Sequence, residues 1–142
     1  MKKVLAGGTF NLLHPGHIFF LEKAKELGDY LVVVVANDKT VAREKKFLVM
    51  PAAARKKIIE KMRMVDKAVI GDEKDFMKVV RKERPDIIAL GYDQKIDEEM
   101  LTRQTEKIGL KCRIVRINSS LKGYKTERIL RVLKKNGQKS SP

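Results

Sequence analysis

Cysteine and long apolar runs are both scarce in this sequence. The single cysteine, Cys112, excludes an internal disulfide and suits a reducing compartment. We interpret it as a small core residue beside a strand rather than as a nucleophile. The longest apolar run, residues 30–36, is far too short to span a bilayer, and the first residues show no apolar segment typical of a secretory signal. We therefore expect a cytoplasmic protein with no membrane contact.

Acidic and aromatic residues are also few. The 142 residues include 32 Lys and Arg against 18 Asp and Glu, for a formal charge of +14, and only 6% are aromatic. Such a basic surplus favours nucleic acid, an anionic surface or phosphorylated small molecules as ligands. The lysines are spread along the chain and are not interleaved with aromatic side chains that could stack on bases. We therefore expect a basic, solvated surface, phosphate ligands at some loops, and no specific nucleic-acid partner.

Short apolar runs alternate with amphipathic segments along most of the chain. The predicted strands are an apolar run at residues 4–6 that ends at Gly7-Gly8, and residues 30–36, 66–71, 86–91 and 112–117. The predicted helices are residues 15–27, 51–64, 73–83, 97–108 and 126–136. Residues 38–50 are charged and irregular, with partial helical character. Residues 137–142 are a predicted disordered tail, which leaves one domain over residues 1–136.

Strands that alternate with helices predict right-handed crossovers and a parallel sheet. We expect an α/β, Rossmann-like single domain, with a five-stranded parallel sheet covered by helices on both faces. In such sheets the ligand lies beyond the carboxyl ends of the strands, where the strand order reverses. The functional residues should therefore follow the ends of the predicted strands.

The loop after the first predicted strand, GGTFNLLHPGH, has the features of an anion site. Gly7 and Gly8 allow a sharp turn and a close approach of the backbone to a ligand. The next helix begins at about Pro15, so its free N–H groups and its dipole face the same place. Thr9 can add a hydroxyl donor, and the Phe10 amide can add another.

Both histidines of the chain, His14 and His17, lie in this loop. Their spacing puts them on one side of the first helical turn, and Gly16 leaves room for a ligand between them. Two imidazoles can donate hydrogen bonds to phosphate oxygens as charge develops at phosphorus. Alternatively, His14 caps the helix and His17 is a hydrogen-bonded, half-buried residue. A zinc site is poorly supported, because no Cys, Asp or Glu stands at a suitable spacing.

The segment G-T-F-N-x-x-H-P-G-H resembles the signature of the cytidylyltransferase-like nucleotidyltransferases. Further segments, KAKELGDYLVVVVANDKTV, RKKIIEKMRMVDKAVIGD and PDIIALGYDQ, resemble archaeal FAD synthases and glycerol-3-phosphate cytidylyltransferases. The resemblance implies that a phosphate of the acceptor attacks the α-phosphorus of a nucleoside triphosphate in line and releases pyrophosphate. Mg²⁺ is the implied cofactor and would enter with the triphosphate rather than on ligands of the protein.

The resemblance also implies roles for individual residues. His14 and His17 would stabilise the transition state, and Lys45 or Lys46 would match the family's phosphate-binding lysine, unless this pair is merely solvated. The expected nucleotide-binding residues are Gly8, Thr9, Phe10, His14, Pro15, Gly16, His17, Asp93, Tyr124 and Thr126. Arg55 either touches substrate or joins an ion pair.

Two positions depart from the family pattern. Where relatives carry an I-S-[ST]-T-like stretch before the last helix, this chain has Tyr124-Lys125-Thr126-Glu127, so only Thr126 is retained as a phosphate-binding hydroxyl. It is also a plausible N-cap. Asn11 replaces the commoner Asp, which removes one carboxylate from the neighbourhood of the metal.

The acceptor is the least determined part of the expectation. The GYDQ and VDKAVIGD segments favour FMN, with ATP as donor, and hence an FMN adenylyltransferase. Glycerol 3-phosphate with CTP is the alternative within the family. A non-catalytic nucleotide- or RNA-binding module is the alternative outside it, although such a module has little reason to keep both histidines. Related enzymes are often homodimers, and a homodimer is possible here.

Overall fold

A computed structural model describes residues 1–11, 13–43, 50–92 and 94–117. Its strands are β1 (Lys3–Gly8), β2 (Tyr30–Val35), β3 (Lys67–Ile70), β4 (Ile87–Gly91) and β5 (Arg113–Ile117). Its helices are α1 (Pro15–Glu26), α2 (Asp38–Arg43), α3 (Ala52–Glu60), α4 (Met77–Glu83) and α5 (Glu98–Lys107). The predicted helix at residues 126–136 and the predicted tail lie outside the described residues, so the domain limits stay a prediction.

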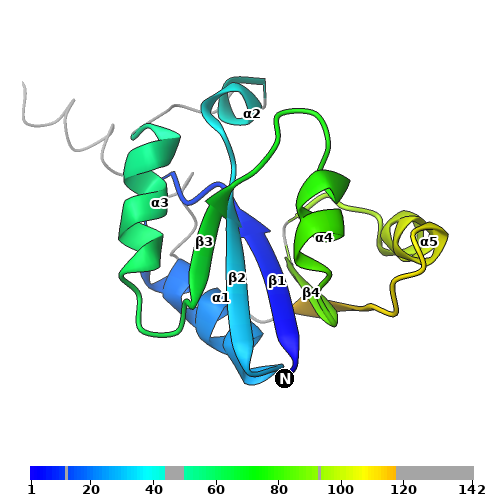
Figure 1. Ribbon diagram of the computed structural model, residues 1–142. Helices are drawn as coiled ribbons and strands as arrows, with labels where there is room; N and C mark the ends of the chain where they lie inside the picture. Colours follow the sequence, from blue (N-terminus) through cyan, green and yellow to red (C-terminus); the bar gives the residue numbers. More distant parts are fainter. Residues whose placement is uncertain (12, 44–49, 93, 118–142) are drawn as a thin grey trace, which may run out of the picture.

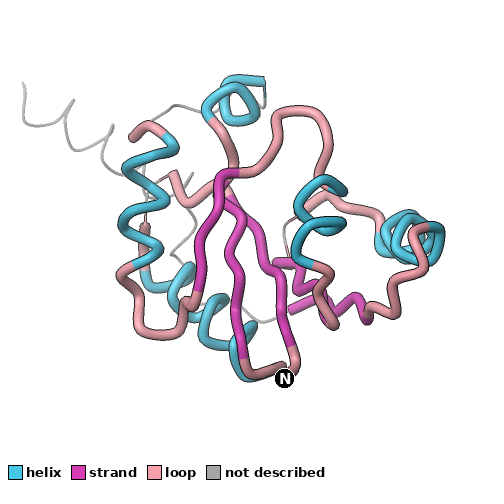
Figure 2. The backbone as a smooth tube through the Cα atoms, viewed as in Figure 1, coloured by secondary structure: helices cyan, strands magenta, loops and turns pink. Residues whose placement is uncertain are grey.

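The five strands form one parallel sheet in the order β3-β2-β1-β4-β5 (Figure 2). The central strand β1 pairs with β2 along its whole length, from Lys3 with Tyr30 to Gly8 with Val35. Figure 1 shows α1 and α3 on one side of the sheet and α4 and α5 on the other. The expected Rossmann-like α/β fold, with helices on both faces, is therefore confirmed.

Alternate residues of the inner strands supply two cores. Val33 and Val35 of β2 pack with Leu21 of α1 and Ile59 of α3 in one buried cluster. Val32 and Val34 pack with residues of α4 and α5 in the other. Because both faces of the sheet are covered, the run YLVVVV is apolar throughout rather than alternating. β-Branched residues suit such a strand, which is why the sequence pattern located it well.

Side-chain hydrogen bonds shape the starts of two helices, one of which begins later than predicted. The helix expected from residue 73 begins only at Met77, because Asp72 accepts from the Lys74 and Asp75 amides and Asp75 accepts from the Met77 amide. Such local bonds offer the backbone an alternative to a helix. The irregular stretch after β2 begins with the short helix α2, whose Thr40 amide donates to Asn37 Oδ1 at 2.8 Å.

Charged side chains hold the amino ends of the strands together. Glu83 at the end of α4 is 6% exposed, and it pairs with Lys67 of β3 at 2.8 Å and with Lys3 of β1 at 3.4 Å. Burial alone would raise the pKa of Glu83, but the hydrogen bonds and charges of Lys67 and Lys3 outweigh it and leave this pKa below its ordinary value.

Among the described residues, no helix is long and apolar enough to cross a bilayer.

The lowered pKa of Glu83 predicts a loss of stability in acid. A carboxyl whose pKa is lower in the folded state stabilises the fold above its unfolded pKa, and this contribution disappears as the pH falls through the folded pKa. We expect Glu83→Gln to lower the free energy of unfolding at pH 7 by about 1–2 kcal/mol. The variant should also lose less stability than the parent between about pH 5 and pH 3.

Urea unfolding at pH 7 and between about pH 5 and pH 3 measures the free energy of unfolding of the parent and of Glu83→Gln. Glu60→Gln is the matched control, because the ion pair of Glu60 with a described residue is the exposed pair with Lys56 on α3; its effect should stay below about 0.5 kcal/mol. Equal losses for the two variants at pH 7 would contradict the assigned role of Glu83.

Candidate functional site

The sheet opens at the carboxyl ends of β1 and β4. The ladder between these strands ends at the pair Ala6–Ala89, although β1 stays paired with β2 as far as Gly8 and β4 stays paired with β5 as far as Gly91. The strand order reverses at this point, because β2 and β3 lie on one side of β1 while β4 and β5 lie on the other. In open parallel sheets, ligands bind beyond the carboxyl ends of the strands at such a reversal of strand order.

His14 and His17 meet at the start of α1, which follows β1. Their ring centroids are 3.8 Å apart, with an angle of 32° between the ring planes, and both residues are half-buried. The two imidazoles thus form the pair that their spacing predicts. The first turn of α1 contains no acidic residue, so no carboxylate of that turn offsets the positive end of the helix dipole.

His14 also caps this helix. Its Nδ1 accepts a hydrogen bond from the Gly16 amide at 3.1 Å. An Nδ1 that accepts carries no proton, so in the neutral ring the proton lies on Nε2. The two roles that the sequence left as alternatives are therefore compatible, since the cap selects the tautomer that keeps Nε2–H as a donor.

Phe10 packs beneath the histidine pair. Its ring contacts the edge of His17, with 5.4 Å between centroids, and Phe10 is only 2% exposed. The backbone of Phe10 is left-handed, with φ of 51°, an unusual and strained conformation for a bulky residue. A Cβ on Gly8 would come within 2.8 Å of the same ring. The glycine that we expected to open space for a ligand therefore makes room for Phe10.

Arg55 of α3 forms an ion pair inside the protein. Its guanidinium, 0% exposed, donates to Asp38 Oδ1 at 2.8 Å and to the carbonyl oxygens of Thr9 at 2.7 Å and Ala36 at 2.6 Å. Its Nε donates to the Met50 carbonyl at 2.9 Å. Of the two roles considered for Arg55, the structure therefore supports the ion pair. Through these bonds Arg55 holds the segments that follow β1 and β2.

Three polar residues that sequence analysis did not select also tie the strand ends together. Asn37 Nδ2 donates to the Gly71 carbonyl at 3.0 Å and so joins the ends of β2 and β3. Gln94 and Arg116 join the ends of β1, β4 and β5. Their signal in the sequence is proximity to a strand end, because the partners that they bind on other strands lie 34, 87 and 25 residues away along the chain.

The remaining predicted site residues fall in two groups. Gly8, Thr9, Phe10, His14, Pro15, Gly16 and His17 lie together in the segment between β1 and the first turn of α1. Lys45, Lys46, Asp93, Tyr124 and Thr126 lie outside the described residues, so their roles stay predictions. Within the part of the chain that the structure describes, no three His, Cys, Asp or Glu side chains gather as a metal site.

Cys112 has the properties of an inert thiol. Burial, with a contribution from the negative charge of Asp86, raises the pKa of Cys112 to about 11. The thiol therefore stays protonated at neutral pH, whereas a cysteine nucleophile reacts as the thiolate. This agrees with its interpretation as a structural residue.

A glycine loop and a histidine pair at a helix N-terminus, placed where a parallel sheet changes strand order, are features of α/β proteins that bind phosphate groups. The cytidylyltransferase-like family model matches residues 5–139, and the chain belongs to this family. Curated relatives named FAD synthase are 51% identical in Ferroglobus placidus and 49% identical in Archaeoglobus profundus, each over 84% of this chain and over 78% and 76% of the relative. A Thermoplasma volcanium structure, described as a lipopolysaccharide core biosynthesis protein, superposes with a TM-score of 0.82 at 45% identity, over 85% of this chain and 98% of its own.

The packing of Phe10 predicts different outcomes at the two adjacent glycines. Gly8→Ala should displace the Phe10 ring and lower the free energy of unfolding by about 1–3 kcal/mol. Gly7→Ala is the matched control, because a Cβ there would meet nothing closer than 3.5 Å; its cost should stay below about 1 kcal/mol. Chemical unfolding of both variants compares them. Equal stability would show that the Phe10 ring moves away without cost.

Proposed function

We propose that this protein is an FMN adenylyltransferase, an FAD synthase, which transfers the adenylyl group of ATP to FMN and releases pyrophosphate. The observation that carries the reaction type is the pair His14–His17 at the start of α1, the helix that follows the central strand β1, with 3.8 Å between the ring centroids. The choice of acceptor is supported by the relatives named FAD synthase, which match over most of this chain.

In the proposed reaction, an oxygen of the FMN phosphate attacks the α-phosphorus of ATP. The bond between this phosphorus and the oxygen of the leaving pyrophosphate breaks on the opposite side. The attacking phosphate is already ionised near neutral pH, so no side chain needs to remove a proton from it. The reaction therefore depends on positioning and on stabilisation of the charge on the α-phosphoryl oxygens.

The residues at the start of α1 are suited to that task. The Gly16 amide selects the tautomer of His14 in which Nε2–H is a hydrogen-bond donor. The ring of His17 lies next to the ring of His14. Donors held in place before the reaction stabilise developing charge without reorganisation. The net charge of +14 attracts two anionic substrates to one site.

The proposal extends to residues outside the described part of the chain. Lys45 or Lys46 would bind phosphate, Asp93 the ribose or base, and Tyr124 and Thr126 the triphosphate. Mg²⁺ would bind with ATP and neutralise part of its charge. Cytoplasmic location and a homodimer belong to the same proposal. Glycerol 3-phosphate with CTP is the second candidate pair, because the same motifs resemble the glycerol-3-phosphate cytidylyltransferases.

A substrate screen tests the proposed function. Purified protein is incubated with ATP or CTP, with FMN, glycerol 3-phosphate or phosphopantetheine, and with Mg²⁺ or EDTA. We expect pyrophosphate and FAD only from ATP with FMN in the presence of Mg²⁺. Transfer of a cytidylyl group to glycerol 3-phosphate would replace FMN by the second candidate. Absence of pyrophosphate in every mixture would favour a non-catalytic nucleotide- or RNA-binding module.

Substitution of His17 tests the mechanism. His17→Ala should lower kcat about a hundredfold, with the dissociation constant of ATP changed by less than about threefold, because the lost donor acts mainly in the transition state. His17→Gln keeps an N–H donor and should retain more activity. Glu22→Ala, an exposed position on the same helix, is the control and should match the parent. Full activity of His17→Ala would contradict the role of the histidine pair.

A further inference from the structure

The carboxyl ends of β1 and β4 are bridged by one side-chain amide. Gln94 Nε2 donates to the Gly7 carbonyl of β1 at 3.0 Å, and Gln94 Oε1 accepts from the Gly91 amide of β4 at 2.7 Å. The backbone ladder between these strands has already ended at Ala6–Ala89. The amide of Gln94 therefore connects β1 and β4 beyond the last backbone pair, and its length sets how far the two strand ends separate.

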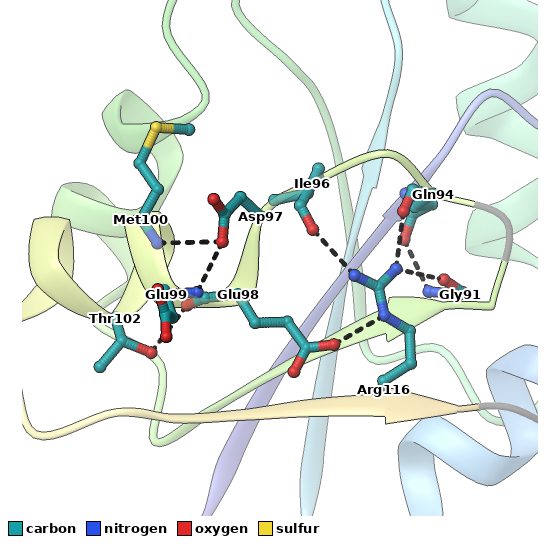
Figure 3. Close-up of polar contacts among 9 residues, drawn as sticks. All are labelled: Gly91, Gln94, Ile96, Asp97, Glu98, Glu99, Met100, Thr102 and Arg116. Atoms are coloured by element: carbon teal, nitrogen blue, oxygen red, sulfur yellow. Dashed lines mark hydrogen bonds and ion pairs between the residues drawn. The ribbon is translucent and has the colours of Figure 1, made fainter.

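Arg116 of β5 holds the segment that carries Gln94. Figure 3 shows its guanidinium among the carbonyl oxygens of Gly91, Gln94 and Ile96, with the Glu98 carboxylate on the opposite side. The three bonds to carbonyl oxygens are 2.7–2.8 Å long, and the bond from Nε to Glu98 Oε1 is 2.8 Å. Arg116 thus fixes the main chain at both ends of the segment between Gly91 and Ile96.

A guanidinium fits this position better than an ammonium would. Its planar fork presents five N–H donors in a fixed geometry, and here donors from all three nitrogens are used. The Arg116 side chain is 19% exposed, so most of these bonds are shielded from water. Buried carbonyl oxygens that lose their donors are costly, and a lysine could serve only some of them from one point.

Gln94 and Arg116 act on the same two strand ends. Gly7 immediately precedes the segment Gly8-Thr9-Phe10, and Gly91 immediately precedes Tyr92. A shift of Gly7 relative to Gly91 therefore moves the segments that follow β1 and β4 relative to each other. The paired strands below, from Val4 with Ile87 to Ala6 with Ala89, do not depend on either side chain.

We propose that Gln94 and Arg116 are positioning residues that set the separation of the carboxyl ends of β1 and β4 and thereby the affinity for the nucleotide. This proposal rests on the proposed function for the identity of the nucleotide, ATP. It concerns binding rather than the chemical step, because neither side chain is required to touch the reacting phosphates.

Two substitutions that leave the net charge of the protein unchanged test the proposal. Gln94→Met keeps the length of the side chain but removes both hydrogen bonds of the bridge. Arg116→Lys keeps the positive charge but removes the fork. The matched controls are Gln104→Met on α5 and Arg113→Lys on β5, because Gln104 and Arg113 are both exposed. Calorimetric titration with a non-hydrolysable ATP analogue gives the dissociation constants, and circular dichroism gives Tm.

We expect Gln94→Met and Arg116→Lys each to raise the dissociation constant about tenfold, with kcat at saturating ATP reduced less than about threefold, which is the pattern for lost ground-state positioning. Hydrogen exchange of the Gly91 amide should accelerate in Gln94→Met, because this amide loses its acceptor. Both controls should bind as the parent does. A merely structural role would lower Tm and leave the dissociation constant of the folded protein unchanged.

An unchanged dissociation constant in folded Gln94→Met would overturn the proposal, whatever happens to Tm. Failure of both variants to fold would also overturn it, since the pair would then be needed for the fold itself. If the parent protein binds the ATP analogue but makes no FAD, the proposed function fails and the binding comparison still decides the positioning role. If the parent binds no analogue, the positioning role is rejected as well.

Discussion

The buried guanidinium of Arg55 is the interaction on which the site end of this protein depends. A fully buried cation is strongly unfavourable unless hydrogen bonds and an opposite charge compensate it. Here Asp38 and the carbonyl oxygens of Thr9, Ala36 and Met50 do so. Thr9 follows β1, and Ala36 and Asp38 follow β2. The hydrogen bonds that compensate the buried charge of Arg55 therefore hold both of these segments in place.

Side chains that bind the main chain continue this organisation along the sheet. Asp38 Oδ1 also accepts from the Ala52 amide at 2.8 Å, so the partner of Arg55 caps α3, whose own N-cap residue Pro51 offers no side-chain bond. Asn37 connects β2 with β3, and Gln94 connects β1 with β4. The backbone ladder between β1 and β4 can therefore end at Ala6–Ala89 while Gly7 and Gly91 keep hydrogen-bond partners through Gln94.

The histidine pair depends on this support. Phe10 adopts a left-handed backbone directly after Thr9, whose carbonyl is held by Arg55. The Phe10 ring then occupies the space left by Gly8 and supports His17. The strained residue, the glycine and the imidazole thus form one packed unit, and the surrounding bonds stabilise a conformation that an isolated loop would leave.

Local patterns in the sequence determined the helices and strands and the meeting of His14 with His17 at the start of α1. The β-branched run at β2 and the spacing of His14 and His17 are patterns within a few residues. The strand and the pairing of the two imidazoles could therefore be predicted from the sequence directly. The start of α4 was placed too early, because the Asx bonds of Asp72 and Asp75 compete with a helix in a way that composition does not reveal. The bonds of Arg55 to Asp38 and of Gln94 to Gly7 span 17 and 87 residues. Only the tertiary structure decided them, because the strand order β3-β2-β1-β4-β5 determines which strand ends become neighbours, and no local pattern encodes that order.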